Sequence, residues 1–362
     1  MKRRDFRDRT PLPPEHGGRA APVEVEPAPP PRIGVLYGES AGLWVAPIVQ
    51  SMVEAASALG FPLQVIPAEH WTPKVGRDQG IDRLYVLPFD VPGGADASAA
   101  AWIRTNFPRI EVVNSPEVHD LCHDKVRAHR LLVARGVPVP ESFVTSSPQD
   151  VREFVAQHQF ALLKPPGAAG ALDQVVLCDS DQVLVGEAGG RRFVVELGED
   201  PEEGRRLREG VLTYPPPFFV QRLVGTSAAR GVFQPGRIMR AYVVGGRVGF
   251  WTERYRERYT RPSDWLLHGG VGVKSRFVLE TSAELRKLAL RAAEALGIRI
   301  GAVDLVRAGA GAIAVEVESD GADMYIDRGF KDFPEYRDAF DFDRMVVAVL
   351  ADVEIPVLSA PI

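Results

Sequence analysis

The segment from Gly301 to Glu318 most constrains this chain, because it places three acids in two apolar runs separated by a short turn of small residues. Asp304 lies inside the first run, whereas Glu316 and Glu318 end the second. Alternate residues of a strand face the same side, so a hairpin through residues 307–311 predicts that the three carboxylates converge. Buried carboxylates need cations. The segment is therefore either a Mg²⁺ site of hard oxygen ligands that bridges phosphates or an edge hairpin with solvated acids.

The overall charge and the cysteines exclude several classes of protein. The formal net charge of −5 gives no electrostatic reason to expect a nucleic-acid or anionic-membrane partner. Cys122 and Cys178 are too few for a disulfide framework. His119 and His123 have helical spacing but lack the accompanying Glu of a zinc motif. No apolar run reaches the roughly 18–20 residues that span a membrane, and no apolar segment follows the basic start, so we expect a cytoplasmic protein.

The chain divides by composition into a tail and a folded part. Residues 1–31 are charged and then proline-rich, which predicts a disordered tail or linker. Residues 32–113 alternate strand and helix patterns, which predicts a small doubly wound α/β unit. The strands expected in this unit cover residues 32–37, 63–66, 84–87 and 110–113, with helices at 46–59 and 98–106. Residues 38–40 follow the first strand, where such folds bind ligands, but they lack a dinucleotide fingerprint.

Lysine is rare in this chain, with only seven among 43 basic residues, so a lysine within a motif is expected to be there for its own chemistry. Lys125 follows Asp124, which can cap a helix that ends at Gly136. A cation in the first turn of a helix opposes the positive end of the helix dipole. Lys125 is therefore either a phosphate ligand together with the helix N-terminus or a solvent-facing side chain.

A second lysine, Lys164, ends an expected strand at residues 160–164. A loop of small residues at 165–171 leads into another expected strand at 174–178, so this segment predicts a hairpin. The backbone N–H groups of the loop could close over phosphates, with Lys164 directed at them. The segment is not a Walker A motif, because no Gly-Lys-Ser/Thr sequence opens a helix.

Further strands follow, and one of them contains an arginine. An apolar strand is expected at residues 218–224, and a Gly245-Gly246 turn predicts a hairpin between strands at 238–244 and 247–251. Arg240 alternates with apolar residues in the first strand of this hairpin. An arginine in the middle of a strand either snorkels at a sheet edge or is held to bind an anion.

The remaining segments predict one loop and two helices. Residues 253–264 are rich in Arg, Glu and Tyr, which predicts a mobile loop or a substrate surface. A capping box at residues 281–284 opens a helix that runs to Leu296 and stops at Gly297. Residues 341–353 predict a terminal helix.

The order of these segments resembles the ATP-grasp superfamily. Within it, the chain is most similar to the carboxylate–amine ligases of the ribosomal-protein-modifying, glutathione-synthetase and lysine-biosynthesis type. The resemblance covers residues 114–320. It is carried by short motifs in the family's order: the Asn114-Ser115 start with Asp124-Lys125, the helix exit at 136–140, Lys164-Pro165 with its glycine loop, Val220-Gln221, Arg240 before Gly245-Gly246, residues 301–304 and residues 316–318.

The resemblance implies an ATP-grasp fold of mixed α/β and α+β class. The doubly wound unit at 32–113 corresponds to the family's usual N-terminal domain. Residues 114–220 would form the central subdomain with its glycine lid loop. Residues 221–362 would form the C-terminal subdomain with the metal site, and residues 1–31 would stay a tail.

The resemblance also implies roles for individual residues. ATP would be bound by the lysines, the lid loop and the adenine strand, which are Lys125, Lys164, Gly167, Gly170, Gln221, Arg222 and Leu223. Two Mg²⁺ ions would be held by Asp304, Glu316 and Glu318. Arg240 and Lys164 would be catalytic, with Arg240 steadying an acyl phosphate and the tetrahedral intermediate that follows.

The activity implied by the resemblance is ATP-dependent joining of a carboxylate to an amine, with release of ADP and phosphate. The substrate would be a small molecule such as an amino acid, or a peptide. One alternative is an ATP-binding pseudoenzyme or regulatory module on the same fold. Another is a peptide-modifying ligase that cross-links side chains, with residues 253–261 holding the peptide. Dimers are common in the family, so a homodimer is a further expectation.

The chain departs from the family's pattern at several positions. Glu318 stands where the family usually has Asn, Ile238 stands where an Asp often precedes the strand arginine, and Arg222 stands where Glu is common. A carboxylate at position 318 can still ligate Mg²⁺, but it adds negative charge. These departures cluster at the expected substrate and ribose contacts.

Overall fold

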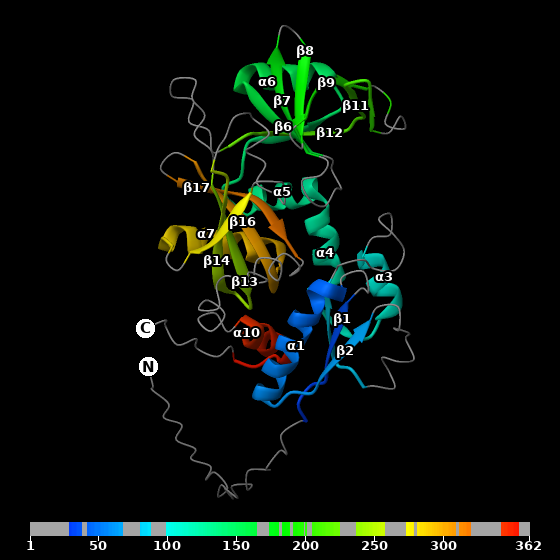
Figure 1. Cartoon of the computed structure of the whole chain (residues 1–362), viewed down its shortest axis with the longest axis vertical. Helices are drawn as coiled ribbons and strands as arrows, with labels where there is room; N and C mark the ends of the chain where they lie inside the picture. The colour runs from blue at the N-terminus through cyan, green and yellow to red at the C-terminus, as the bar shows by residue number, and fades with distance from the viewer. Residues whose placement is uncertain are drawn as a thin grey trace, which may run out of the picture. The chain divides into compact units, whose positions relative to one another are not determined.

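The computed structural model describes most of the chain, and residues 31–362 form one compact unit. The described residues are 29–37, 42–67, 80–87, 99–164, 174–180, 183–188, 191–198, 200, 205–224, 237–257, 273–278, 281–308, 311–319 and 342–354. The expected tail (except its last three residues), residues 38–40 and the loop that contains Gly167 and Gly170 lie outside the described residues. Figure 1 shows the elements in chain order.

The first sheet is built from β1 (Ile33–Tyr37), β2 (Leu63–Pro67), β3 (Arg83–Leu87) and β4 (Glu111–Val113), in the order β2-β1-β3-β4. All of its pairings are parallel. One face packs on α3 (Ala99–Asn106), and the other face packs on α1 (Gly42–Leu59). The parallel pairing and the helices on both faces confirm the doubly wound unit predicted from the sequence.

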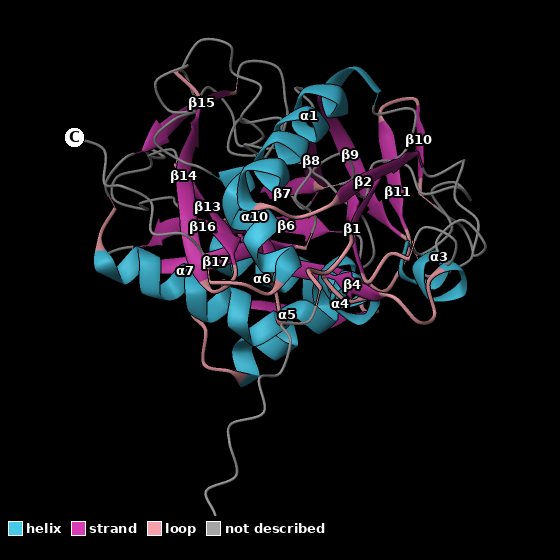
Figure 2. Cartoon of the chain, turned by 90° about the horizontal axis from the view of Figure 1, so that it is seen from below, coloured by secondary structure: helices cyan, strands magenta, loops and turns pink. Residues whose placement is uncertain are grey.

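The helix α10 (Phe342–Ala351) packs beside α1 and joins the same apolar core (Figures 1 and 2). This core includes Ile33 and Val35 of β1, Val346 and Leu350 of α10, and Tyr242 of a later strand. Residues from the beginning and from the end of the folded chain therefore close one core together. The helix ends at Ala351, within the predicted range of 341–353.

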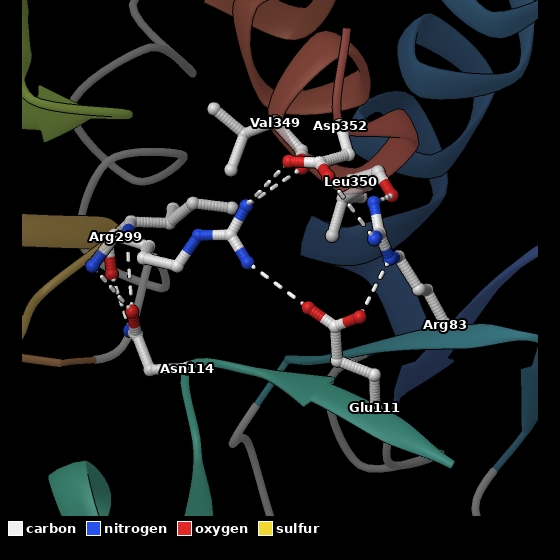
Figure 3. A network of polar contacts seen from close by, with 8 residues as sticks. Arg83, Glu111, Asn114, Arg299, Val349, Leu350 and Asp352 are labelled. Atoms are coloured by element: carbon white, nitrogen blue, oxygen red, sulfur yellow. Dashed lines mark hydrogen bonds and ion pairs between the residues drawn. The ribbon is translucent and has the colours of Figure 1, made fainter. Parts of the chain in front are cut away.

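A polar network fastens the end of α10 to the first sheet (Figure 3). Arg83 donates to the carbonyl oxygen of Leu350, and Arg299 donates to that of Val349, each at 3.1 Å. Glu111 accepts from both arginines, at 2.8 Å from Arg83 Nε and 3.1 Å from Arg299 Nη1. The last carbonyls of a helix lack intrahelical donors, so the two arginines stabilise this helix end.

The central sheet has eight strands in the order β10-β11-β9-β8-β7-β6-β12-β5. The strands are β5 (Ser142–Thr145), β6 (Phe160–Lys164), β7 (Val175–Ser180), β8 (Val183–Ala188), β9 (Arg191–Leu197), β10 (Arg206–Arg208), β11 (Val211–Tyr214) and β12 (Phe218–Arg222). The helix α6 (Pro148–His158) buries Val151, Phe154 and Val155 against one face of this sheet. The antiparallel pairing of β6 with β7 confirms the predicted hairpin around the glycine loop.

The third sheet is antiparallel throughout, in the order β15-β14-β13-β16-β17. Its strands are β13 (Ile238–Val244), β14 (Arg247–Tyr255), β15 (Lys274–Val278), β16 (Ile300–Ala308) and β17 (Gly311–Glu318). Both predicted hairpins are present, one at the Gly245-Gly246 turn and one between β16 and β17.

The helix α7 (Ala283–Leu296) covers one face of the third sheet with the predicted apolar stripe (Figure 2). Its N-cap is Ser282, whose side chain accepts from the N–H of Leu285, so the prediction of a capping box that starts at position 281 was wrong by one residue. Both neighbouring hydroxyl residues can cap a helix, and the sequence alone did not decide between them. Gly297 ends the helix in a left-handed conformation with φ of 74°, as predicted.

Two short helices, α4 (Pro116–His123) and α5 (Lys125–Ala134), pack beside α7. Asp124 is both the C-cap of α4 and the N-cap of α5, and its side chain accepts from the N–H of Arg127. Within the described part of the chain, none of the helices combines the length and the apolar character that a membrane crossing requires.

Candidate active site

Strand register brings the predicted charges of the third sheet together. Arg240 of β13 lies opposite Asp304 of β16, and Asp304 lies opposite Glu316 of β17. Glu318 lies opposite Ala302, one step further along the same face. The register shifts between Asp304 and Leu305, and such a bulge re-aims the side chains beside it. The three carboxylates each offer an oxygen within 4.8 Å of the others, so the predicted convergence is present.

Arg240 is fully buried and forms ion pairs with two of these acids. Its Nε and Nη2 atoms donate to the two oxygens of Asp304 at 2.6 and 2.7 Å. Its Nη1 and Nη2 atoms donate to the two oxygens of Glu318, each at 3.0 Å. Burial alone would lower the pKa of Arg240, but the charges of Asp304 and Glu318 raise this pKa well above its ordinary value. Arg240 is therefore not at a solvent-exposed edge, and its guanidinium is the counter-ion of both carboxylates.

Lys125 provides the counter-ion of the third acid. It is the first residue of α5, and its ammonium forms an ion pair with Glu316. The two side chains are only 10% and 12% exposed. Lys125 therefore does not face solvent but reaches from the helix N-terminus across to β17.

Lys164 ends β6 opposite Phe219 of β12 and is buried. Among the described residues, its side chain forms no hydrogen bond or ion pair. Burial lowers the pKa of Lys164 to about 8, an effect that the charge of Glu316 opposes and that of Lys125 reinforces. The fold thus holds an ammonium group in a poorly hydrated place without a direct counter-ion, which an anionic ligand would supply.

A pocket open to solvent lies between the lysines and β17. Its polar lining consists of Lys125, His129, Lys164, Gln221 and Glu316. Apolar side chains and one thiol complete the wall, namely Cys122, Ala128, Leu132, Val139, Phe219, Ala314, Val315 and Val317. Four residues that the sequence assigned to ATP or metal therefore line one pocket.

The expected adenine strand lies at the end of β12. Gln221 is buried and lines the pocket, whereas the side chain of Arg222 is exposed. The N–H of Arg222 donates to the carbonyl of Glu141 at 2.8 Å, so this backbone donor is used inside the fold. Leu223 is buried against Leu162 in a small apolar cluster.

The sequence did not single out three polar residues near this site. His129 lines the pocket, bonds Ser142 Oγ through Nε2 at 2.6 Å, and has a pKa lowered by burial and by the charge of Lys164. Thr252 lies opposite Arg240, and Arg254 lies opposite Ile238, both buried and in line with the charged face of the sheet.

The sequence contains a pattern that places Arg254 in the strand β14. The sequence predicted that β14 would end at position 251 and that a loop would begin at 253, but the strand continues to Tyr255. Phe250, Thr252 and Arg254 alternate on one face, which is the period-2 pattern of a strand. The high charge of the segment concealed this pattern. Residues 258–264 of the expected loop lie outside the described residues.

The donor set fits a hard divalent cation. The three clustered acids offer only carboxylate oxygens, which Mg²⁺ prefers. A carboxylate has about four lone-pair positions, so the arginine contacts leave acceptor capacity on each acid. Three cations, Arg240, Lys125 and Lys164, balance the three acids in formal charge.

Comparison with solved structures identifies the fold. D-cycloserine synthetase aligns over 88% of this chain and 99% of that chain, with a TM-score of 0.57 and 16% identity. The RimK domain ATP-grasp protein of Sphaerobacter thermophilus aligns over the same shares, with a TM-score of 0.54 and 16% identity. A RiPP-associated ATP-grasp ligase of Chryseobacterium gregarium, solved with ADP and a leader and core peptide, covers 90% of this chain and all of that chain, with a TM-score of 0.57 and 12% identity. The chain has the ATP-grasp fold, as its sequence predicted.

Sequence comparison finds curated relatives that are described as ligases. Probable alpha-L-glutamate ligase of Xanthomonas oryzae pv. oryzae is 28% identical over 196 residues, which are 54% of this chain and 56% of that protein. The protein of the same description from Stenotrophomonas maltophilia is 27% identical over 197 residues. The chain thus matches these relatives over about half of their length. No family model matches the chain.

Proposed function

We propose that this protein is an ATP-dependent carboxylate–amine ligase that releases ADP. The observation that carries the proposal is the single pocket in which Lys125, Lys164 and Glu316 meet, directly beside the Arg240–Asp304 pair. Such a site collects cations and hard oxygen ligands where a metal–triphosphate needs them. The ATP-grasp fold and the similarity to probable alpha-L-glutamate ligases favour the same activity.

Asp304, Glu316 and Glu318 would hold Mg²⁺, with two ions expected. Bound magnesium and ATP would supply an activated γ-phosphoryl group and would neutralise its charge. A carboxylate oxygen of the substrate would bond to the γ-phosphorus while the bond to the ADP oxygen breaks. The neutral nitrogen of an amine would then attack the acyl carbon, and the bond from this carbon to the phosphate oxygen would break. The nitrogen would lose one proton to the leaving phosphate, and an amide would remain.

The two lysines have different parts in this proposal. Lys164 has no direct counter-ion among the described residues, so a phosphate oxygen would recover much of the solvation that its ammonium lost on burial. Lys125 already pairs with Glu316, so it would bridge that metal ligand and a phosphate oxygen at the N-terminus of α5.

Arg240 remains the candidate for stabilising the acyl phosphate and the tetrahedral intermediate. Its guanidinium binds Asp304 and Glu318 side by side, and these two carboxylates would accept a cation together. Gln221 and Leu223 would contact the adenine through their main chain, and the segment with Gly167 and Gly170 would close over the phosphates. The N–H of Arg222 already donates to the carbonyl of Glu141, so Arg222 is the least suited of the three residues to contact the adenine.

A peptide substrate is the second candidate, and one observation favours it. The face of the sheet that carries Arg240 continues to Arg254, which is buried and lies opposite Ile238. A further arginine along this face suits an acidic group of a peptide, and the Chryseobacterium ligase of the same fold was solved with a peptide.

The test is ADP release from ATP and Mg²⁺ in the presence of single amino acids, amino-acid pairs and acidic peptides. We expect release that depends on both a carboxylate and an amine substrate. Lys164→Ala and Glu316→Ala should abolish it, whereas Lys287→Ala and Glu294→Ala, which change exposed positions of α7, should not. ATP binding without turnover across the whole panel would instead establish a binding module or pseudoenzyme.

Two further features belong to this proposal. A cytoplasmic location suits an ATP-consuming enzyme whose two cysteines are free thiols. A homodimer follows only from the resemblance, and sedimentation of the purified protein would test it.

A further inference from the structure

The strand β17 carries two of the candidate metal ligands, Glu316 and Glu318, and Glu318 is its last residue. Ser319 follows it directly. A strand end without anchors frays and cannot fix the side chains near it. Ser319 is nevertheless buried, with 3% exposure. Something must therefore hold it from outside the sheet.

One anchor is the amide of Asn114, which lies between β4 and α4 and is 1% exposed. Its Nδ2 donates to the carbonyl oxygens of Ser319 and Ile300, each at 2.6 Å. Its Oδ1 accepts from the N–H groups of Arg299 at 2.7 Å and Ile300 at 3.1 Å. A single side chain therefore ties the first residue of β16 to the residue after β17, at the open end of the hairpin.

A second anchor comes from α4. His119 Nδ1 and Ser319 Oγ form a hydrogen bond of 2.9 Å, and the imidazole is 2% exposed. Burial lowers the pKa of His119 to about 4, so the ring is neutral under ordinary conditions. Ser319 is thus fixed twice, by its carbonyl through Asn114 and by its hydroxyl through His119.

The backbone of Glu318 is confined from the side of β16 as well. Gly301 lies so close to it that a Cβ at position 301 would be 2.2 Å from the carbonyl oxygen of Glu318. This close approach requires a glycine. Glu318 therefore has a fixed main chain, from which its carboxylate reaches Arg240.

The helices α4 and α5 also hold the neighbouring acid, Glu316. Asp124 joins α4 and α5 without an intervening loop, and the next residue, Lys125, pairs with Glu316. The helix pair α4–α5 is therefore linked to Glu318 through His119 and Ser319, and to Glu316 through Lys125.

We propose that Asn114 and His119 are positioning residues, which hold Ser319 so that Glu318 is correctly placed to bind a divalent cation with Asp304 and Glu316. The inference rests on the proposed function, because it concerns the metal ligands of the same site. Outer partners that orient metal ligands matter for affinity, and their loss weakens metal binding by about 10–100-fold in other proteins.

Mn²⁺ is a suitable probe, because its free form is counted directly by electron paramagnetic resonance and it accepts the same oxygen ligands as Mg²⁺. The full chain would be titrated with Mn²⁺ in the presence of a non-hydrolysable ATP analogue. The affinity for ADP in EDTA would be measured in parallel. A general structural defect lowers both affinities, whereas misplacement of Glu318 lowers only the first.

Ser319→Ala removes the hydroxyl that His119 holds, and Asn114→Asp keeps the shape of the side chain while it replaces the donating Nδ2 by an oxygen. We expect Mn²⁺ to bind about tenfold more weakly to each variant, with the affinity for ADP unchanged. Ser282→Ala is the matched control, because it deletes a hydroxyl at the N-cap of α7, away from the pocket. It should leave both affinities as they are.

Each outcome bears on a defined claim. Mn²⁺ affinities of Ser319→Ala and Asn114→Asp that equal that of Ser282→Ala would overturn the positioning role while the proposed function stands. A wild-type chain that binds neither Mn²⁺ nor nucleotide would overturn both. If Asn114→Asp does not fold, Ser319→Ala and His119→Phe decide the matter, since each leaves the bonds of Asn114 in place.

Discussion

The third sheet and the central sheet both supply a buried cation to the candidate site, but they surround it differently. In the third sheet, Arg240 is enclosed by Asp304 and Glu318, with four hydrogen bonds between 2.6 and 3.0 Å. In the central sheet, Lys164 is buried without an ion pair among the described residues, and its pKa falls to about 8. The first cation is thus neutralised within the fold, whereas the second has no direct counter-ion among the described residues.

This difference predicts that Arg240 contributes mainly to the stability of the fold, whereas Lys164 contributes mainly to ligand binding. Removal of one partner from a buried ion pair leaves an uncompensated charge, so the folded state loses several kcal/mol. Removal of a buried charge that has no partner relieves a desolvation penalty instead. Matched substitutions at Arg240 and Lys164 should therefore change stability in opposite directions.

The largest effect is expected for Arg240→Met. The variant leaves Asp304 and Glu318 without their counter-ion, so the free energy of unfolding should fall by about 3–5 kcal/mol. Urea denaturation followed by circular dichroism would measure this loss. A variant as stable as the wild type would show that the two acids do not depend on Arg240.

Lys164→Met should give the opposite pattern. We expect the free energy of unfolding to stay constant or to rise, because the substitution replaces a buried ammonium by an apolar chain of similar length. The affinity for an ATP analogue should fall by about 1.5–3 kcal/mol, roughly tenfold to more than hundredfold, since a bond to a charged phosphate is lost. Calorimetric titration would measure the affinity, and Lys287→Met on the exposed side of α7 is the control. If Lys164→Met lost as much stability as Arg240→Met, the two buried cations would not differ in their contribution to the free energy of unfolding.

The lowered pKa of Lys164 predicts that stability and nucleotide affinity change in opposite directions as the pH rises. The ordinary lysine value of 10.5 is lowered to about 8 in the folded protein. Above pH 8 the folded protein has lost this proton while the unfolded chain keeps it up to its ordinary pKa, so this group raises stability as pH rises through that window. Nucleotide affinity should fall over the same window, by at most about 1.4 kcal/mol per pH unit. Calorimetric titrations from pH 7 to higher pH would show the decline, and Lys164→Met should lack it.

The smallest effect on stability is expected when the N-cap of a helix that packs on either sheet is removed. Ser147 caps α6 on the central sheet, and Ser282 caps α7 on the third sheet, each through one hydrogen bond to a backbone N–H. Replacement of either serine by alanine should lower the free energy of unfolding by about 1 kcal/mol and leave nucleotide binding unchanged. Thermal denaturation would compare the two variants. A strong loss in only one of them would mean that the sheets differ in general stability and not merely in buried charge.

The local parts of the site could be predicted from the sequence. The convergence of Asp304, Glu316 and Glu318 follows from the strand period and a short turn, and the position of Lys125 follows from a capping residue. These predictions needed only neighbours along the chain. The resemblance to ATP-grasp proteins then supplied the order of the elements, which the comparisons with solved structures confirm.

The long-range parts could not be predicted in this way. The pairing of Arg240 with Asp304 depends on the register between β13 and β16, which are 64 residues apart at these positions. The bond from Asn114 to Ser319 spans 205 residues. Neither contact leaves a pattern within a window of neighbouring residues, because each is set by how whole elements pack. The membership of α10 in the core of the first sheet escaped the sequence for the same reason.

That shared core has a consequence for the synthesis of the chain. The strands of the first sheet leave the ribosome early, but α10, which covers the same face as α1, is made last among the described elements. Ile33, Val35 and Tyr85 therefore remain without their final apolar neighbours until translation has passed Ala351. The core around the first sheet is therefore among the last parts of the described chain to be completed. Until then Arg83 also lacks the carbonyl oxygen of Leu350, to which it donates in the complete structure.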